Sequence, residues 1–223
     1  PSTANLVQQE IGAEHAACFD LSAACTGFLY AMSVADAYIK AGMYKKVLVI
    51  GAEVMSQVVD WKDRSVCVLF GDGAGAVVLG EDSSGKSIFR LHSDSGSAQA
   101  LTLGKENAVH MNGREIFSFA VRKVPESVKE VLEESETAKE QVKYFILHQA
   151  NARMIESIAK RLDVPVEKFP MNLETHGNTS AASIPVLLDE LNRQNRLIPG
   201  DVLILSGFGG GLSWGSALLE WHK

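Results

Sequence analysis

Residues 19–42, FDLSAACTGFLYAMSVADAYIKAG, constrain the fold more than any other stretch of this chain. A short apolar run leads through small residues to Cys25, and a helical pattern follows that stops at Gly42. The stretch therefore predicts a buried strand over 16–22, a tight turn that holds Cys25, and a buried helix. A helix N-terminus carries unpaired N–H groups and about half a positive charge, which favours a nucleophilic thiolate. The alternative is a buried structural cysteine, the commoner situation for a free thiol.

The composition argues against several classes of protein. With 46% hydrophobic and 22% charged residues, the 223-residue chain resembles an ordinary globular protein of one large or two modest domains. Its net charge of -6 argues against nucleic-acid binding as the main function. Three cysteines in a chain of this length indicate a reducing compartment, and no Cys or His pair has metal-ligand spacing. No apolar run reaches the ~20 residues of a membrane span. We therefore expect a cytoplasmic protein with no metal site and no membrane association.

Apolar strands alternate with helical patterns, which is typical of an α/β sheet covered by helices. A first helix is expected to begin at Ser2 or Thr3 and to end at Gly12. Its inward-facing residues are expected to be Leu6, Val7 and Ile11. Residues 45–54, KKVLVIGAEV, have the continuous apolar pattern of a strand buried on both faces. The polar, turn-rich residues 81–87 are the candidate boundary between two domains, 1–84 and 85–223.

The same alternation continues in the second part of the chain. A long amphipathic helix is predicted from Gly113 to about Ser135, with Pro125 inside it. VKYFILHQAN reads as a strand that ends at His148, and ARMIESIAKRL as the helix that follows. The C-terminal DVLILSGFGGGLSWGSALLEW predicts two strands joined by a glycine turn.

Four loops carry residues suited to chemistry. They are SAACTGF at Cys25, LHQANARM at His148, HGNTSAAS at Asn178 and SGFGGGLSWGSA at Gly209–Gly211. Taken singly, each has an ordinary structural explanation: a satisfied histidine, an asparagine turn or a tight glycine turn. Open α/β sheets, however, place ligand chemistry in the loops at strand ends. We therefore expect Cys25, His148 and Asn178 to converge on one site.

These loops, with FGDGAGA at 70–76, resemble the thiolase-fold condensing enzymes, and more narrowly the β-ketoacyl-acyl carrier protein synthase III family. The resemblance covers effectively the whole chain and implies a layered α-β-α-β-α fold made of two related halves. Members of the family begin roughly a quarter of their length earlier. On this resemblance, residues 1–84 are the N-terminally truncated first half, which carries the nucleophilic cysteine. Residues 85–223 are the second half, which carries His148 and Asn178.

The resemblance implies an acyltransferase that initiates fatty acid biosynthesis. Cys25 is acylated by a short acyl-CoA primer, and a malonyl group on acyl carrier protein then loses CO2 and attacks the acyl-cysteine. Decarboxylation places negative charge on the thioester oxygen, to which the His148 Nε2–H and the Asn178 amide can donate. The backbone N–H groups of Cys25 and Gly210 would form a separate oxyanion hole for the acyl-cysteine. Acyl-CoA is the substrate, and no cofactor is expected.

Family resemblance also assigns a tunnel and a docking surface. The residues implied along the CoA and pantetheine tunnel are Gly113, Phe117, Ala150 and Asn151. Arg153, Lys160 and Arg161 fall on one face of the predicted helix after His148, where the family docks its acidic carrier protein. A solvated helix face is the alternative for these charges. A homodimer is expected from the resemblance alone.

Two other functions remain open on the sequence. The first is a condensing or acyl-transfer enzyme of secondary metabolism that uses CoA thioesters without a carrier protein. The second is a non-catalytic subunit that lacks part of the N-terminal half. The choice of primer, straight acetyl or branched, is not determined by these residues.

Overall fold

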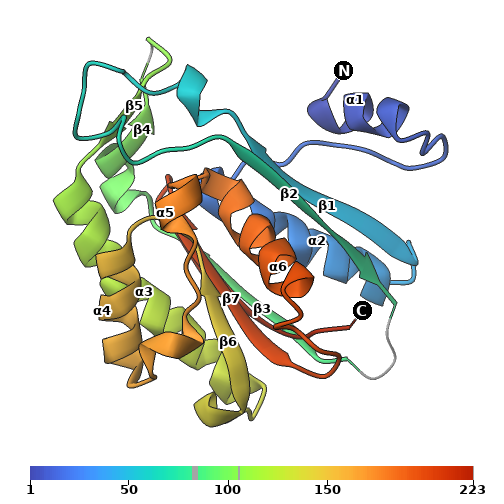
Figure 1. Ribbon diagram of the computed structural model, residues 1–223. Coiled ribbons are helices and arrows are strands. Elements are labelled where there is room, and N and C mark those ends of the chain that lie inside the picture. The colour runs from blue at the N-terminus through green and yellow to red at the C-terminus, as the bar shows by residue number, and fades with distance from the viewer. Residues whose placement is uncertain (82–84, 105, 223) are drawn as a thin grey trace.

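The computed structural model describes residues 1–81, 85–104 and 106–222 (Figure 1). Its α-helices are α1 (Thr3–Glu10), α2 (Gly27–Lys40), α3 (Gly113–Glu134), α4 (Ala152–Leu162), α5 (Leu173–His176) and α6 (Ser183–Arg193). Its strands are β1 (Lys46–Glu53), β2 (Gly73–Gly80), β3 (Ser87–Ser93), β4 (Leu101–Leu103), β5 (Val109–Met111), β6 (Val142–Leu147), β7 (Val202–Gly209) and β8 (Ser213–Glu220). The predicted division between residues 84 and 85 falls at the edge of the gap and so lies outside the described residues.

The described elements stack in alternating layers of helices and strands. β3, β8, β7 and β6 form a four-stranded sheet in that order, in which only β6 and β7 are parallel. β1 and β2 form a separate antiparallel pair. α2 and α6 lie between this pair and the four-stranded sheet, while α3 and α4 cover the sheet's other face (Figure 1). This arrangement confirms the layered α/β fold.

The two larger apolar clusters of the interior lie on opposite faces of the four-stranded sheet. On one face, α3 and α4 pack against β6, β7 and β8 around Phe145, Ile204 and Leu218. On the other face, α2 and α6 pack around Ile146 and Leu205. Helices thus cover both faces of the parallel pair β6 and β7, although β6 is the edge strand of the sheet among the described residues.

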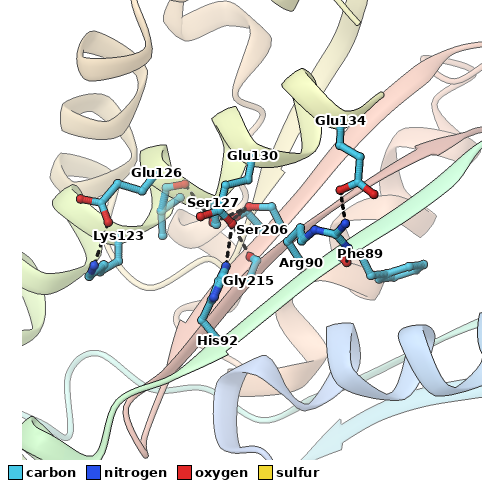
Figure 2. Close-up of polar contacts among 12 residues, drawn as sticks. Phe89, Arg90, His92, Lys123, Glu126, Ser127, Glu130, Glu134, Ser206 and Gly215 are labelled. Carbon is cyan, nitrogen blue, oxygen red and sulfur yellow. Dashed lines mark hydrogen bonds and ion pairs between the residues drawn. The ribbon is translucent and has the colours of Figure 1, made fainter. Parts of the chain in front are cut away.

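The helix α3 is fastened to the sheet by polar contacts as well as by packing (Figure 2). Glu134 pairs with Arg90 of β3, and Glu130 lies 2.6 Å from the Nε2 of His92. Beneath these exposed pairs, the buried hydroxyl of Ser127 contacts Ser216 at 2.7 Å, and Ser216 donates to Ser206 at 2.8 Å. The predicted helix is confirmed, and Pro125 lies within it.

The first helix has the predicted ends but not the predicted buried face. Ser2 caps α1 by accepting from the Asn5 N–H at 3.2 Å, and Gly12 follows with a φ of +67°. Leu6 and Ile11, expected to face inward, are exposed, because α1 lies at the periphery of the described molecule (Figure 1).

The buried strand predicted over 16–22 is wrong. Residues 15–23 have no regular secondary structure, and Phe19 is 53% exposed. A strand needs a neighbour to pair its backbone N–H and C=O groups, and this segment has no ladder partner among the described residues.

The prediction that residues 45–54 form a strand buried on both faces is half right. β1 is a strand, but its residues alternate between buried and exposed, and Leu48 is 44% exposed opposite Val78 of β2. β1 and β2 pair only with each other among the described residues, and α2 and α6 cover one face of this pair. The pattern of apolar residues predicted the strand correctly, but it did not indicate which faces of that strand other elements cover.

One turn geometry occurs twice, which agrees with two related halves. The 3₁₀ turn η1 (Ala24–Thr26) leads directly into α2, and the 3₁₀ turn η6 (Ser180–Ala182) leads directly into α6. Each turn opens with a residue of positive φ, +48° at Ala24 and +51° at Ser180. L-residues adopt this conformation rarely, so its recurrence marks equivalent positions.

Gly51 of β1 is predicted to be intolerant of any side chain. A Cβ added there would lie 2.5 Å from the carbonyl oxygen of Ala181, which is backbone and cannot turn away. We expect Gly51→Ala to lower the free energy of unfolding by about 1–3 kcal/mol in urea denaturation. Gly80→Ala is the matched control, since nothing lies within 4 Å of a Cβ at that strand position. Equal urea unfolding midpoints for the two variants would contradict the expectation that this contact excludes a side chain.

Candidate active site

Cys25 lies where the sequence predicts it, in the turn immediately before a buried helix. It is the middle residue of η1, and the Thr26 hydroxyl holds the turn by donating to the Ala23 carbonyl at 2.5 Å. The β7–β8 turn packs directly on it: a Cβ added to Gly209 would lie 2.8 Å from the Cys25 nitrogen. This close approach requires glycine and presents the sulfur beside the end of β7.

His148 follows β6 and is almost entirely buried, with 2% of its surface exposed. Its backbone N–H donates to the Ser206 carbonyl at 2.8 Å, and its Nδ1 lies 2.7 Å from the Ser183 hydroxyl. Ser183 also accepts from the Gln149 N–H at 3.3 Å. When the Ser183 hydroxyl donates to Nδ1, the ring proton of a neutral His148 lies on Nε2. Burial lowers the pKa of His148 to about 4, so the ring is neutral at pH 7.

Asn178 is held by the loop that precedes η6. Its backbone N–H donates to the Leu69 carbonyl at 2.8 Å, and its carbonyl accepts from the Gly71 N–H at 3.0 Å. The side-chain Oδ1 accepts from the Ser180 N–H at 2.9 Å. Because Oδ1 already accepts this hydrogen bond, the polar group of the side chain that remains for a ligand is Nδ2, which donates.

All three side chains line one cavity of about 310 Å³. Cys25 comes from a loop more than a hundred residues before those of His148 and Asn178, and the fold brings the three to the same space. The five remaining residues predicted for the oxyanion hole and the tunnel also line it: Gly113, Phe117, Ala150, Asn151 and Gly210. The predicted convergence is therefore present.

The protonation state predicted for Cys25 is wrong. The pKa of the thiol is raised to about 11, mainly by burial; a hydrogen bond with Ser180 acts in the opposite direction, and the nearby Glu53 carboxylate adds to the rise. The N-terminus of α2 was expected to favour a thiolate, but desolvation of a charged sulfur outweighs it here. The resting residue is thus a thiol, and its proton must be removed when the sulfur attacks.

Two predicted groups have structural contacts of their own. Asn151, besides lining the cavity, caps α4 by accepting from the Arg153 N–H at 2.9 Å. His176, which the sequence suggests shapes the Asn178 loop, lies 2.6 Å from Glu190 through its Nε2. Glu190 also accepts from Asn172 at 2.9 Å, so this carboxylate joins the loop to α6.

Arg153, Lys160 and Arg161 are all exposed on α4. The opposite face of this helix is buried through Met154, Ile155 and Ile158, so the three cations share the solvent side. α4 begins at Ala152, next to the cavity-lining Asn151. The basic face therefore extends outward from the region of the cavity.

Sequence reasoning missed three residues that contact the site. Ser183 fixes the histidine ring, Ser180 contacts Cys25, and Glu53 accepts from the Ser180 hydroxyl at 3.2 Å. The serines lie within HGNTSAAS, where small hydroxyl residues directly after the asparagine were a usable signal. Glu53 ends an apolar strand, and nothing local to that strand points to Cys25.

No helix in the described part of the chain is both long enough and apolar enough to cross a membrane.

Comparison with known proteins agrees with the geometry of the site. Residues 19–109 match the family described as 3-oxoacyl-[acyl-carrier-protein] synthase III, and residues 132–221 match its C-terminal part. A beta-ketoacyl-[acyl-carrier-protein] synthase III from Clostridium acetobutylicum is 47% identical over 238 residues, which cover 100% of this chain and 73% of that protein. The rest of that relative, about a quarter of its length, has no counterpart here, as the resemblance predicts.

Solved structures give the same result. The 3-oxoacyl-[acyl-carrier-protein] synthase III of Aquifex aeolicus superposes with a TM-score of 0.97 at 46% identity, covering 99% of this chain and 72% of that one. The priming β-ketosynthase of the R1128 polyketide pathway superposes with a TM-score of 0.93 at 36% identity, covering 98% and 70%. With its cavity, its three convergent loops and these relatives, the chain belongs to the 3-oxoacyl-[acyl-carrier-protein] synthase III family.

Proposed function

We propose that this chain is an acyltransferase that joins a short acyl group from acyl-CoA to a malonyl group on acyl carrier protein, the first condensation of fatty acid synthesis. The observation that carries the proposal is the convergence of Cys25, His148 and Asn178 on one cavity. The set combines a nucleophile with two neutral hydrogen-bond donors, which is what acyl transfer followed by decarboxylation requires.

In the first half-reaction, the Cys25 sulfur bonds to the thioester carbonyl carbon and CoA leaves. The tetrahedral intermediate carries an oxyanion, for which the backbone N–H groups of Cys25 and Gly210 are the proposed donors. Gly210 lines the cavity, and its neighbour Gly209 packs against the Cys25 backbone. Backbone donors suit this role because they are fixed before the reaction begins.

In the second half-reaction, the malonyl thioester loses CO2 and its carbanion attacks the acyl-cysteine. The developing enolate oxygen is stabilised by His148 through Nε2–H and by Asn178 through Nδ2–H. Both groups are neutral donors, so neither must remove a proton from the substrate. The low pKa of His148 suits this role, because a neutral ring keeps Nε2–H as a donor without adding a fixed charge.

The cavity fits the narrow arm of a CoA or carrier-protein substrate. Its volume of about 310 Å³ lies at the small end of ligand pockets, which run from about 300 to 1,000 Å³. Its described lining is mainly apolar, including Met111, Ile116, Phe117 and Phe208. Such a lining restricts bulk water, which would otherwise protonate the carbanion. Gly113, Ala150 and Asn151 are proposed to line the same tunnel.

The basic face of α4, made of Arg153, Lys160 and Arg161, is the proposed docking surface for the acidic carrier protein. Reversing one charge there, Arg153→Glu, should raise the carrier-protein KM about 3- to 10-fold by weakening electrostatic attraction. Exchange of acyl-CoA with Cys25 should change little, because that step needs no carrier protein. Steady-state kinetics with malonyl-acyl carrier protein measure the first quantity, and single-turnover acylation measures the second.

The matched control for this charge reversal is Lys45→Glu, at an exposed lysine in the turn before β1. It makes the same change of net charge away from α4. If both activities fall together in Arg153→Glu, or if the two variants raise KM equally, the docking assignment is wrong.

The family resemblance also leads us to propose a cytoplasmic homodimer. Its oligomeric state can be measured by light scattering on the purified chain.

A second candidate is the priming of a secondary metabolic pathway, favoured by the likeness to the R1128 priming β-ketosynthase. The chain should be supplied with an acyl-CoA primer and with either malonyl-acyl carrier protein or malonyl-CoA. Release of CO2 with a β-ketoacyl product on the carrier protein supports the first function. Turnover with malonyl-CoA alone supports a CoA-dependent enzyme, and absence of any acyl adduct supports a non-catalytic subunit.

A further inference from the structure

The oxyanion hole proposed for the acyl-cysteine is built from two segments that are far apart in the chain. One donor, the Cys25 N–H, belongs to η1, and the other, the Gly210 N–H, belongs to the turn between β7 and β8. That turn consists largely of glycine, whose backbone is freer than that of any other residue. Donors to an oxyanion are effective because they are fixed before the reaction begins. The two segments therefore need other groups to hold them in register.

Two buried hydroxyl groups connect the segments. Thr26 is 0% exposed and Ser213 is 6% exposed, and their side-chain oxygens lie 2.7 Å apart. The Thr26 Oγ1 also lies 2.5 Å from the Ala23 carbonyl oxygen, in the turn that holds Cys25. The Ser213 hydroxyl reaches the Gly210 carbonyl at 3.0 Å. A continuous line of polar contacts therefore runs from η1 to the residue that supplies the second donor.

The hydrogens of the two hydroxyls are sufficient for this line. When the Thr26 hydrogen is donated to Ala23, the Ser213 hydrogen is shared between the Thr26 oxygen and the Gly210 carbonyl. When the Thr26 hydrogen turns to Ser213, the Ser213 hydrogen goes to Gly210 alone. The Ala23 carbonyl then still accepts from the Thr26 N–H at 3.1 Å. Both arrangements keep the Gly210 carbonyl bound to the hydroxyl pair.

The backbone on either side of Gly210 is already anchored. Gly209 faces Ser213 in the β7–β8 ladder, and Leu212 exchanges two hydrogen bonds of 2.8 Å with Asp94. Gly210 lies between these positions, and its carbonyl is held by the Ser213 side chain. Because peptide groups are planar, holding the residue before Gly210 and the carbonyl after it restricts the direction of its N–H. The Ser213 hydroxyl therefore acts on the orientation of this donor.

We propose that the hydroxyl pair of Thr26 and Ser213 positions the Gly210 N–H beside the Cys25 N–H and so sets the geometry of the oxyanion hole. The inference rests on the proposed function, because it concerns the intermediate formed on Cys25. Neither hydroxyl belongs to the described lining of the cavity. Thr26 and Ser213 act through the backbone of other residues and are positioning residues.

The test removes the two hydroxyls one at a time, as Ser213→Ala and Thr26→Val. We expect each variant to be acylated by acetyl-CoA about 10-fold more slowly in single-turnover experiments followed by intact mass. The loss is smaller than the 10²- to 10³-fold typical of a deleted donor, because the N–H is loosened and not removed. The acetyl-CoA concentration that gives half the maximal rate should change little. CO2 release from a malonyl thioester should stay near the wild-type rate, because that step uses His148 and Asn178.

Two further variants examine the hydroxyl contact itself. Thr26→Ser keeps the hydroxyl and should be acylated at nearly the wild-type rate. The double variant Thr26→Val/Ser213→Ala should be acylated no more slowly than the slower single variant, because either substitution already breaks the one connection. Thr26→Val and Ser213→Ala break this contact from opposite sides, so either variant that folds decides the test.

Ser127→Ala is the matched control. Ser127 and Ser216 form another buried hydroxyl pair with the same 2.7 Å separation, which joins α3 to β8 outside the described lining of the cavity (Figure 2). Its loss should lower the urea midpoint about as much as Ser213→Ala does, and should leave acylation unchanged. Amide hydrogen exchange over residues 209–212 should accelerate in Ser213→Ala and not in the control.

Three results would overturn the positioning role. They are acylation at the wild-type rate in both hydroxyl variants, a comparable loss of acylation in Ser127→Ala, and an equal loss of acylation and CO2 release. A wild-type chain that forms no acyl adduct would refute the proposed function and this inference with it. A wild-type chain that forms the adduct at a rate that both variants match would refute the role of the hydroxyl pair alone.

Discussion

Replacing Cys25 with alanine should abolish acyl-enzyme formation and lower condensation roughly 10⁴- to 10⁶-fold, the usual consequence of removing a covalent nucleophile. Incubation with acetyl-CoA followed by intact mass should give one acyl group on the wild-type chain and none on the variant. Decarboxylation of a malonyl thioester should persist in the variant, because the donors to the enolate oxygen are on His148 and Asn178.

Cys18→Ala is the control for this result. The chain has two other free cysteines, Cys18 and Cys67, both partly exposed and both outside the described lining of the cavity. An adduct that persists in Cys25→Ala and disappears in Cys18→Ala would place the nucleophile elsewhere. An adduct lost from both variants would show damage to the fold, which circular dichroism would detect.

The second large expected effect concerns His148 and Asn178, the two proposed hydrogen-bond donors to the enolate oxygen. His148→Ala and Asn178→Ala should each lower the rate of CO2 release from the malonyl thioester about 10²- to 10³-fold, the typical cost of one donor to a developing oxyanion. Acylation of Cys25 should fall much less in Asn178→Ala, because the amide has no part in the first half-reaction. The double variant should lose less than the product of the two single losses, since both donors serve one oxygen.

The comparison needs a substitution of the same kind away from the site. His15→Ala removes an exposed imidazole from the segment before Cys25 and should leave both half-reactions at the wild-type rate. If Asn178→Ala lowers acylation and decarboxylation by the same factor, the amide supports the loop rather than the enolate.

The features that the sequence predicted correctly depend on short segments. The turn at Cys25, the helix α2 with Gly42 at its end, and the helix α3 all follow from local periodicity and capping residues. The β7–β8 hairpin follows from a glycine turn between two apolar runs. In each of these cases, the residues that fix the structure are neighbours in the chain.

The incorrect predictions concern neighbours that local patterns do not contain. Residues 16–22 have an apolar run but no paired strand among the described residues, and Leu48 on β1 is 44% exposed. Both errors arise because an apolar pattern shows that a segment tends to be buried, while burial itself requires a partner.

The candidate site likewise has features that the sequence predicted and features that it missed. Its three principal residues were found because each lies in a distinctive loop at a strand end. The contacts that set their protonation were missed, because Ser180 and Glu53 are separated by 127 positions. The error on the Cys25 thiolate has the same origin: the helix terminus is visible in the sequence, whereas the buried surroundings that raise the pKa are not.

The central claim is that one site first takes an acyl group on Cys25 and then transfers it to a decarboxylated malonyl group. The most direct measurement is to acylate the chain with acetyl-CoA, remove the free CoA thioester, add malonyl-acyl carrier protein, and follow both proteins by intact mass over time. The account predicts that the acyl mass leaves Cys25 at the rate at which a β-ketoacyl mass appears on the carrier protein. An acyl group that stays on Cys25, or that is lost to water while the malonyl carrier protein remains unchanged, would contradict it.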